Sequence, residues 1–161
     1  MHKILEIGCG TGRNLPHLLK TNAQVHAVDF DFDAVSTARS FLDGKGFFAV
    51  ALGEQLPFHN DVFHEVHCID VLHWSPSQEQ FESLWREAWR VMHPDGSFFA
   101  RTRCAKSKTV STSGASTWFL PDLLLLQKLA ADTGADGFKP LLINVVAEEH
   151  AEVTLILRKK V

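Results

Sequence analysis

Three glycines lie close to the start of the chain, in the stretch "ILEIGCGTGRN" from Ile4 to Asn14. Gly8, Gly10 and Gly12 alternate with other residues directly after an apolar run. A glycine loop between a strand and a helix leaves backbone N–H groups and the positive end of the helix free to meet a negatively charged ligand group. We therefore expect the N–H groups from Gly10 to Asn14 to bind an anionic group such as a carboxylate.

Two common phosphate-binding loops do not fit this spacing. The dinucleotide fingerprint needs a glycine or alanine where Arg13 stands, so that the helix can pack closely on the strand. The P-loop needs a Gly-Lys-Ser/Thr sequence, which does not follow the glycines. The pattern is instead Glu-x-Gly-x-Gly-x-Gly, from Glu6 to Gly12, and it argues against a nicotinamide-dependent oxidoreductase.

Composition excludes several other classes of protein. With 161 residues, of which 45% are hydrophobic, the chain fits a single domain over residues 1–161. A net charge of −3 gives no reason to expect a nucleic-acid partner. No apolar run approaches the ~18 residues of a membrane span, and the start lacks a signal-peptide pattern. Cys9, Cys68 and Cys104 form no disulfide framework, which indicates a cytoplasmic protein.

Hydrophobic patterning alternates between strand-like and helix-like segments. Strands are expected at Lys3–Ile7, Gln24–Asp29, Phe47–Leu52, Val62–Ile69 and Ser97–Arg103, and helices over about Asn14–Lys20, Asp31–Leu42 and after Ser77. His93–Gly96 is predicted as a turn, and Pro121 as the first position of a helix that stops at Gly134. Two strand-like runs within Pro140–Lys159 are too close for a parallel crossover. The prediction is an α/β fold with a doubly wound, mostly parallel seven-stranded sheet and a C-terminal antiparallel hairpin.

The fourth predicted strand is unusually polar, because Glu65 and His67 stand in a run that should be apolar if the strand is central. His64 and His67 are three residues apart on a strand and so point to opposite faces. No Cys or His pair has the spacing of a zinc site. We therefore expect no metal.

Together these segments resemble, in order, the motifs of class I S-adenosylmethionine-dependent methyltransferases over nearly the whole chain. The glycine segment is similar to the family's motif I, and "VHAVDFD" ends the second strand with an acid, Asp29. The stretches "GEQLPF" (53–58), "CIDVLHW" (68–74) and "LWREAWRVMHPDGSFFAR" (84–101) resemble the adenine loop, the segment where methyl transfer takes place, and the helix, turn and fifth strand. More narrowly, the chain resembles bacterial methyltransferases of type 11 and of the tellurite-resistance type.

The resemblance implies S-adenosylmethionine as the cofactor and S-adenosylhomocysteine as the product. Asp29 would hold the ribose hydroxyls, because the paired oxygens of a carboxylate accept two hydrogen bonds, and Glu6 would favour the ammonium group. Leu52 stands where the family usually has an aspartate, which leaves adenine recognition to the neighbouring residues. The expected cofactor-binding residues are Glu6, Gly8, Cys9, Gly10, Gly12, Arg13, Asn14, Asp29, Phe30, Gly53, Glu54, Gln55 and Ile69.

Asp70 and His73 are the candidate catalytic residues, because they follow the fourth strand, where the resemblance places methyl transfer. The sulfonium is already a good leaving group, so the protein mainly has to align the acceptor, the methyl group and the sulfur. A base is needed only when the acceptor carries a proton of high pKa. Asp70 and His73 therefore act either as a base or by orienting the loop.

The expected activity is methyl transfer to a small molecule. Cys9, Cys68 and Cys104 fall near the ends of neighbouring strands, so one hypothesis is a thiol patch suited to a metalloid or chalcogen acceptor. The other interpretation of these cysteines is ordinary packing of small apolar residues. The alternative function is a non-catalytic S-adenosylmethionine-binding module or partner subunit.

The sequence also raises the question of what closes the site. The glycine loop begins close to Met1, so we expect the helix that commonly precedes the first strand in the resembled family to be absent. Three features could replace it: the loop from Ala105 to Thr117, the "LHWSP" segment with Trp74, or a second chain. Because apolar surface left bare favours association, we expect a homodimer.

Overall fold

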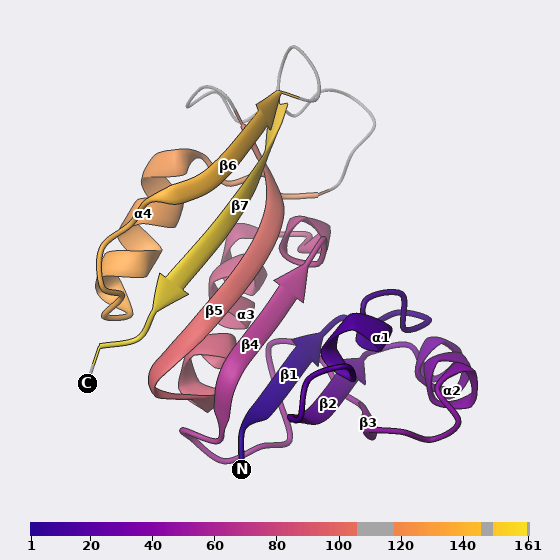
Figure 1. The fold of residues 1–161 in the computed structure, drawn as a ribbon. Helices are drawn as coiled ribbons and strands as arrows, with labels where there is room; N and C mark the ends of the chain where they lie inside the picture. The colour runs from indigo at the N-terminus through magenta and orange to yellow at the C-terminus, as the bar shows by residue number, and fades with distance from the viewer. Residues whose placement is uncertain (106–117, 146–149, 161) are drawn as a thin grey trace.

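The computed structural model describes residues 1–105, 118–145 and 150–160, and these form one seven-stranded sheet in the order β3-β2-β1-β4-β5-β7-β6 (Figure 1). The elements are β1 (Lys3–Ile7), α1 (Leu15–Leu18), β2 (Gln24–Asp29), α2 (Phe32–Phe41), β3 (Phe47–Val50), β4 (Phe63–Ile69), the 3-10 turn η1 (Leu72–Trp74), α3 (Gln78–Val91), β5 (Met92–Ala105), α4 (Leu123–Asp132), β6 (Pro140–Val145) and β7 (His150–Arg158). The strands β1 to β5 pair in parallel, and β7 runs antiparallel to both β5 and β6. The doubly wound sheet with a C-terminal hairpin is confirmed.

Side-chain caps explain where the longer helices begin. The Asp31 carboxylate accepts hydrogen bonds from the first-turn N–H groups of α2, and the Ser77 hydroxyl accepts one from the first turn of α3. Pro121 was expected at the first position of α4, but the helix begins two residues later. Asp122 is its N-cap and accepts a hydrogen bond from the N–H of Leu125. A carboxylate satisfies that N–H directly, which a proline cannot do.

The predicted turn at His93–Gly96 is wrong. Helix α3 ends at Val91 and β5 begins at Met92, so the four residues lie within the strand. They form an irregular stretch, because the pairing with β4 shifts register there and Asp95 has a φ of +67°. The N–H of Asp95 donates to the carbonyl of Lys159, and the N–H of Lys159 donates to the carbonyl of Gly96. These two hydrogen bonds hold the stretch against the C-terminal end of the chain.

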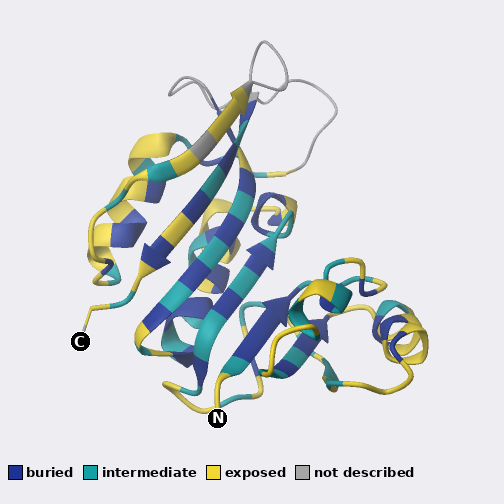
Figure 2. Ribbon diagram, viewed as in Figure 1, coloured by how far each residue is buried: buried dark blue, intermediate teal, exposed yellow. Residues whose placement is uncertain are grey.

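The helices cover the sheet unevenly. Helices α3 and α4 pack on one face and close the larger core, which includes Trp85 and Phe98. Helices α1 and α2 cover only the β2–β3 end of the opposite face, over a smaller core that includes Leu15 and Ala38. In the parts of the chain that the structure describes, no helix covers that face over β4, β5 and β7 (Figures 1 and 2).

We call this uncovered side of β4, β5 and β7 the open face. It explains the polar fourth strand, because Glu65 and His67 lie on it while Val66 and Cys68 are buried on the other side. A His67 ring nitrogen lies 3.1 Å from a Glu65 oxygen, and the His67 ring stacks on Phe99 at 4.7 Å between centroids. A half-buried face of this kind tolerates alternating polar residues.

Candidate functional site

The glycine loop is held in place by positions that only glycine suits. Gly8 has a φ of +69°, and a Cβ on it would lie 2.3 Å from Cγ2 of Val71. Gly12 has a φ of +91°, and its Cβ would lie 3.1 Å from the Cβ of Ala38 in α2. Around Gly10, which also has a positive φ, the position of a Cβ is open. The loop is therefore packed on both sides and open at its centre.

Asp29 ties the glycine loop to the end of β2. One of its carboxylate oxygens accepts a hydrogen bond from the N–H of Gly10 at 2.8 Å, and the other accepts one from the N–H of Asp31 at 3.1 Å. The residue is 9% exposed. Each oxygen keeps a second lone pair, so the carboxylate can still accept hydrogen bonds from a ligand with two hydroxyl groups.

Glu6 is the most deeply buried acidic residue of the site, with 1% of its surface exposed. Its Oε1 accepts a hydrogen bond from the side-chain amide of Asn14 at 2.8 Å, while Oε2 has no hydrogen-bond partner among the described residues. Burial raises the pKa of Glu6 to about 7, although Asn14 and Arg13 lower it in part. A buried carboxylate oxygen without a partner suits a cationic ligand group, since such an oxygen is costly to leave unpaired.

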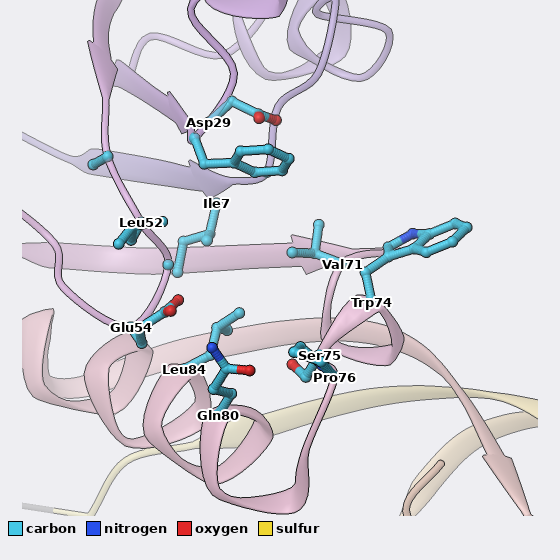
Figure 3. Close-up of a pocket in the computed structure, with 14 residues that line it drawn as sticks. Ile7, Asp29, Leu52, Glu54, Val71, Trp74, Ser75, Pro76, Gln80 and Leu84 are labelled. Atoms are coloured by element: carbon cyan, nitrogen blue, oxygen red, sulfur yellow. The ribbon is translucent and has the colours of Figure 1, made fainter. Parts of the chain in front are cut away.

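A pocket of about 190 Å³ opens beside the loop (Figure 3). The predicted residues that line it are Gly8, Asp29, Phe30, Gly53 and Glu54. Gln55 lies instead in an adjacent shallow groove, which Phe30 and Leu52 also line. The other predicted cofactor residues, Glu6, Cys9, Gly10, Gly12, Arg13, Asn14 and Ile69, do not line the pocket.

The sequence interpretation missed part of this pocket. Trp74, which follows β4, is predicted from the sequence only as part of a closing segment, and Gln80 and Leu84 of α3 are not among the predicted site residues, yet all three line the pocket. Figure 3 shows Trp74 on the segment after β4 at one side of the pocket, and Gln80 and Leu84 reaching it from α3. Helix α3 lies beneath the loop after β3, and its residues therefore line the pocket. The helical spacing of these residues alone does not indicate this.

Asp70 is held by two arginines. Arg101 donates to one carboxylate oxygen at 2.8 Å through Nε and contacts the other through its terminal nitrogen, and Arg13 lies 3.4 Å away. The hydrogen bond with Arg101 holds the pKa of Asp70 below its usual range. Asp70 also has a φ of +62°. A carboxylate held in this way is a weak base, so its geometry suits an orienting role.

His73 is 6% exposed and lies outside the pocket lining. Its Nδ1 accepts a hydrogen bond from the backbone N–H of Arg103 at 3.4 Å. Burial and then the charge of Arg103 lower the pKa of His73, so the ring is neutral near pH 7. Like Asp70, it is placed to fix the segment after β4.

The predicted thiol patch does not form. Cys9 packs in the small core under α1 and α2, whereas Cys68 and Cys104 lie in the larger core. Cys68 pairs with Ala100, and Cys104 is four residues further along β5, a separation of about 13 Å. All three are buried, and burial raises the pKa of each thiol, that of Cys9 to about 12. They fill space in the core and offer no shared thiol site for an acceptor.

Within residues 1–105, 118–145 and 150–160, no three His, Cys, Asp or Glu side chains gather in a way that could hold a metal ion. In the same ranges no helix is long and apolar enough to cross a membrane. Residues 106–117, which include most of the Ala105–Thr117 loop considered as a closing segment, lie outside the described residues.

Comparison with known proteins identifies the class. Residues 5–100 match the family described as a methyltransferase domain, which is more than half of the chain, and the chain belongs to this family. Methyltransferase GfsG of Streptomyces halstedii is 30% identical in an alignment of 101 residues that covers 59% of this chain. The aligned part spans only 35% of GfsG.

Solved structures share the fold over nearly the whole chain. YcgJ of Bacillus subtilis matches with a TM-score of 0.84 at 16% identity, covering 99% of this chain and 92% of YcgJ. A phosphoethanolamine N-methyltransferase of Haemonchus contortus, in complex with S-adenosylhomocysteine, matches with a TM-score of 0.82 at 16% identity, covering 99% of this chain and 49% of its own. The family and this fold support the predicted cofactor, S-adenosylmethionine.

Proposed function

We propose that this chain transfers a methyl group from S-adenosylmethionine to a small-molecule acceptor. One observation carries the proposal: Glu6, the glycine loop and Asp29 form a continuous row of polar groups along the carboxyl ends of β1 and β2. Glu6 offers an unpartnered buried oxygen at one end, and Asp29 offers spare lone pairs at the other. These donors and acceptors fit an amino acid joined to a ribose.

Each part of the cofactor has a matching group in this row. The N–H groups of Gly10 and Gly12 already donate to Asp29 and to the carbonyl of Cys9, so those of Thr11, Arg13 and Asn14 would receive the cofactor's carboxylate. Glu6 would receive its ammonium group directly or through water. Asp29 would accept hydrogen bonds from the ribose hydroxyls. Leu52 and Gly53, which line the pocket beyond Asp29, would contact the adenine. When bound, the cofactor supplies an activated methyl group on a positively charged sulfur.

The chain's own contribution to the reaction is alignment of the reacting groups. Val71 packs on Gly8, so the segment after β4 is seated directly on the glycine loop. Asp70, directly before Val71, is fixed by a hydrogen bond from Arg101. His73, two residues after Val71, is fixed by a hydrogen bond from the backbone N–H of Arg103. This arrangement would position an acceptor for in-line displacement without requiring a base.

Calorimetric titration with S-adenosylhomocysteine tests the cofactor site. Wild-type protein should bind it, and Asp29→Ala should bind at least about tenfold more weakly, since each lost hydrogen bond to a charged group is worth about 1.5–3 kcal/mol. Asp33→Ala, an exposed change in the first turn of α2, is the matched control and should bind like wild type. Equal affinities in Asp29→Ala and Asp33→Ala would contradict the ribose assignment.

Activity is tested separately with labelled S-adenosylmethionine and a panel of small acceptors. Transfer of the label to an acceptor supports an enzyme. Binding of S-adenosylhomocysteine with no transfer to any acceptor would favour the alternative, a non-catalytic cofactor-binding module or partner subunit.

We also propose a homodimer. Large apolar side chains are exposed around the pocket, with Phe30 at 74% and Leu52 at 50%. Burying them against a second chain would remove this area from water. Light scattering at micromolar concentration should show a dimer. A monomer that binds S-adenosylhomocysteine tightly would contradict the idea that a second chain completes the site.

A further inference from the structure

Positive charge gathers beside the cofactor pocket, around the segment that follows β4. Arg101 and Arg103 are two residues apart on β5, so their side chains leave the same side of the strand, on the open face. Arg13 reaches the same place from the glycine loop and lies 3.4 Å from Asp70. Two guanidinium groups, those of Arg13 and Arg101, therefore contact the Asp70 carboxylate, and Arg103 leaves β5 on the same side as Arg101.

The pocket itself has the opposite charge. Its charged lining residues among those that the structure describes are Asp29 and Glu54, with no lysine or arginine, and Glu6 is buried behind the loop. This acidic side matches the ammonium and hydroxyl groups that the proposed cofactor presents. Arginines are not needed for those groups, and Arg101 and Arg13 already hold Asp70, so Arg103 is the arginine that could serve a different ligand.

Arg103 differs from the other two arginines in its partners. Arg101 and Arg13 both pair with Asp70. Glu152 is the cross-strand neighbour of Arg103, yet its carboxylate lies 3.9 Å from Nε of Arg101. None of the ion pairs in the described part of the chain uses the Arg103 guanidinium. This side chain is exposed, and its backbone N–H is bound to His73.

We propose that Arg103 binds an anionic group, a carboxylate or a phosphate, on the methyl acceptor. The inference rests on the proposed function. A guanidinium presents its N–H groups as a planar fork that matches both kinds of anion. Arg101 is engaged by Asp70 and lies 3.9 Å from Glu152, so Arg103 is the guanidinium left to bind an anion. His73 lies between the backbone of Arg103 and the Trp74 side chain. The Trp74 ring lies 5.3 Å from the His73 ring and is half exposed at the pocket. An acceptor with its anionic end at Arg103 would place its body over Trp74.

Fragment binding tests this proposal before the natural acceptor is known. Benzoate, benzamide and inorganic phosphate are titrated into protein saturated with S-adenosylhomocysteine, and binding is followed by NMR. We expect at least one of the two anions to bind and benzamide, the uncharged counterpart of benzoate, to bind at least about tenfold more weakly. Preference for benzoate or for phosphate distinguishes a carboxylate acceptor from a phosphorylated one.

Two variants assign the binding to Arg103. Arg103→Gln should weaken the binding of the preferred anion at least about tenfold, and Arg103→Lys, which keeps the charge but loses the fork, should weaken it less. Arg39→Gln, the matched change on the exposed end of α2, should have no effect. The proposal would be overturned if benzamide bound as tightly as benzoate, or if Arg103→Gln bound the preferred anion as tightly as wild type. The affinity for S-adenosylhomocysteine is measured on the same samples, so a failure of the cofactor site is seen independently.

Discussion

The two sides of the site are built in different ways. On the cofactor side, β1, the glycine loop and β2 hold their shape mainly through backbone conformation and through bonds between residues close in sequence, such as Asn14 to Glu6, although Val71 also packs on Gly8. On the side after β4, the shape depends on pairs far apart in sequence, such as Asp70 with Arg101. Backbone requirements restrict the choice of residue strongly, whereas a side-chain pair can be replaced by other pairs. Substitutions on the cofactor side should therefore have larger effects.

The largest effect is expected for Gly8→Ala. The new Cβ would lie 2.3 Å from Cγ2 of Val71, on a residue whose φ is +69°. Overpacking and the left-handed backbone together should lower the free energy of unfolding by about 4 kcal/mol and abolish binding of S-adenosylhomocysteine. Chemical denaturation and calorimetry measure the two effects.

Gly44→Ala is the matched control for Gly8→Ala. Gly44 has a φ of +70°, but no atom lies within 4 Å of the position of its Cβ. It therefore shares the backbone cost without the clash. The double variant Gly8→Ala with Val71→Ala should recover part of the lost stability. If Gly8→Ala proved no worse than Gly44→Ala, the contact with Val71 would not be what restricts the loop.

This difference in construction also decides what could be predicted from the sequence. The succession of strands and helices and the start of the second helix near Asp31 follow from local patterns, and the structure contains them. Gly8 and Asp29, expected from the glycine pattern and the family resemblance, line the pocket. The roles of the remaining cofactor residues stay predictions. The pairing of Asp70 with Arg101 joins residues on two strands, and no local pattern indicates it.

Two further errors have similar causes. The turn expected at His93–Gly96 has the residues of a turn, but hydrogen bonds with Lys159 hold it within β5. The thiol patch assumed that strand ends bring cysteines together, yet Cys9 faces a different core from Cys68. The arrangement of the cysteines depends on which face of the sheet each residue occupies, and the stretch from His93 to Gly96 depends on contacts near the C-terminal strand. A short segment of sequence indicates neither.

An intermediate effect is expected from the protonation of Glu6. Its pKa is raised to about 7, so the folded protein keeps a proton that the unfolded chain has lost above about pH 4.5. The free energy of unfolding should therefore fall as the pH rises from about 4.5 to about 7, by about 2–3 kcal/mol, and change little with Glu6 above that range. Denaturation of Glu6→Gln across this pH range should show a flatter profile. Identical profiles would contradict the raised pKa.

The same residue links the pH dependence to the ligand. The ammonium group of S-adenosylhomocysteine would favour the charged form of Glu6, so binding near pH 6 should release a proton. Calorimetry in buffers of different ionisation enthalpy measures this release. Glu6→Gln should bind without it, and release of the same size in both proteins would place the titrating group elsewhere.

The smallest effect is expected on the other side of the site, for Arg101→Gln. The side chains of Arg101 and Asp70 are 35% and 30% exposed, and water screens such a pair, so the free energy of unfolding should fall by no more than about 1 kcal/mol. The pKa of Asp70 should rise toward its ordinary value, because the hydrogen bond that lowers it is lost. In wild type, the stability from this pair is present above the unfolded pKa of Asp70 and disappears as the pH falls through the lower, folded pKa. NMR titration of the Asp70 carboxyl carbon measures the shift.

Affinity of Arg101→Gln for S-adenosylhomocysteine should stay within about twofold of wild type, because the cofactor side keeps its backbone contacts. A loss as large as that in Asp29→Ala would show that the two sides of the site are not built independently.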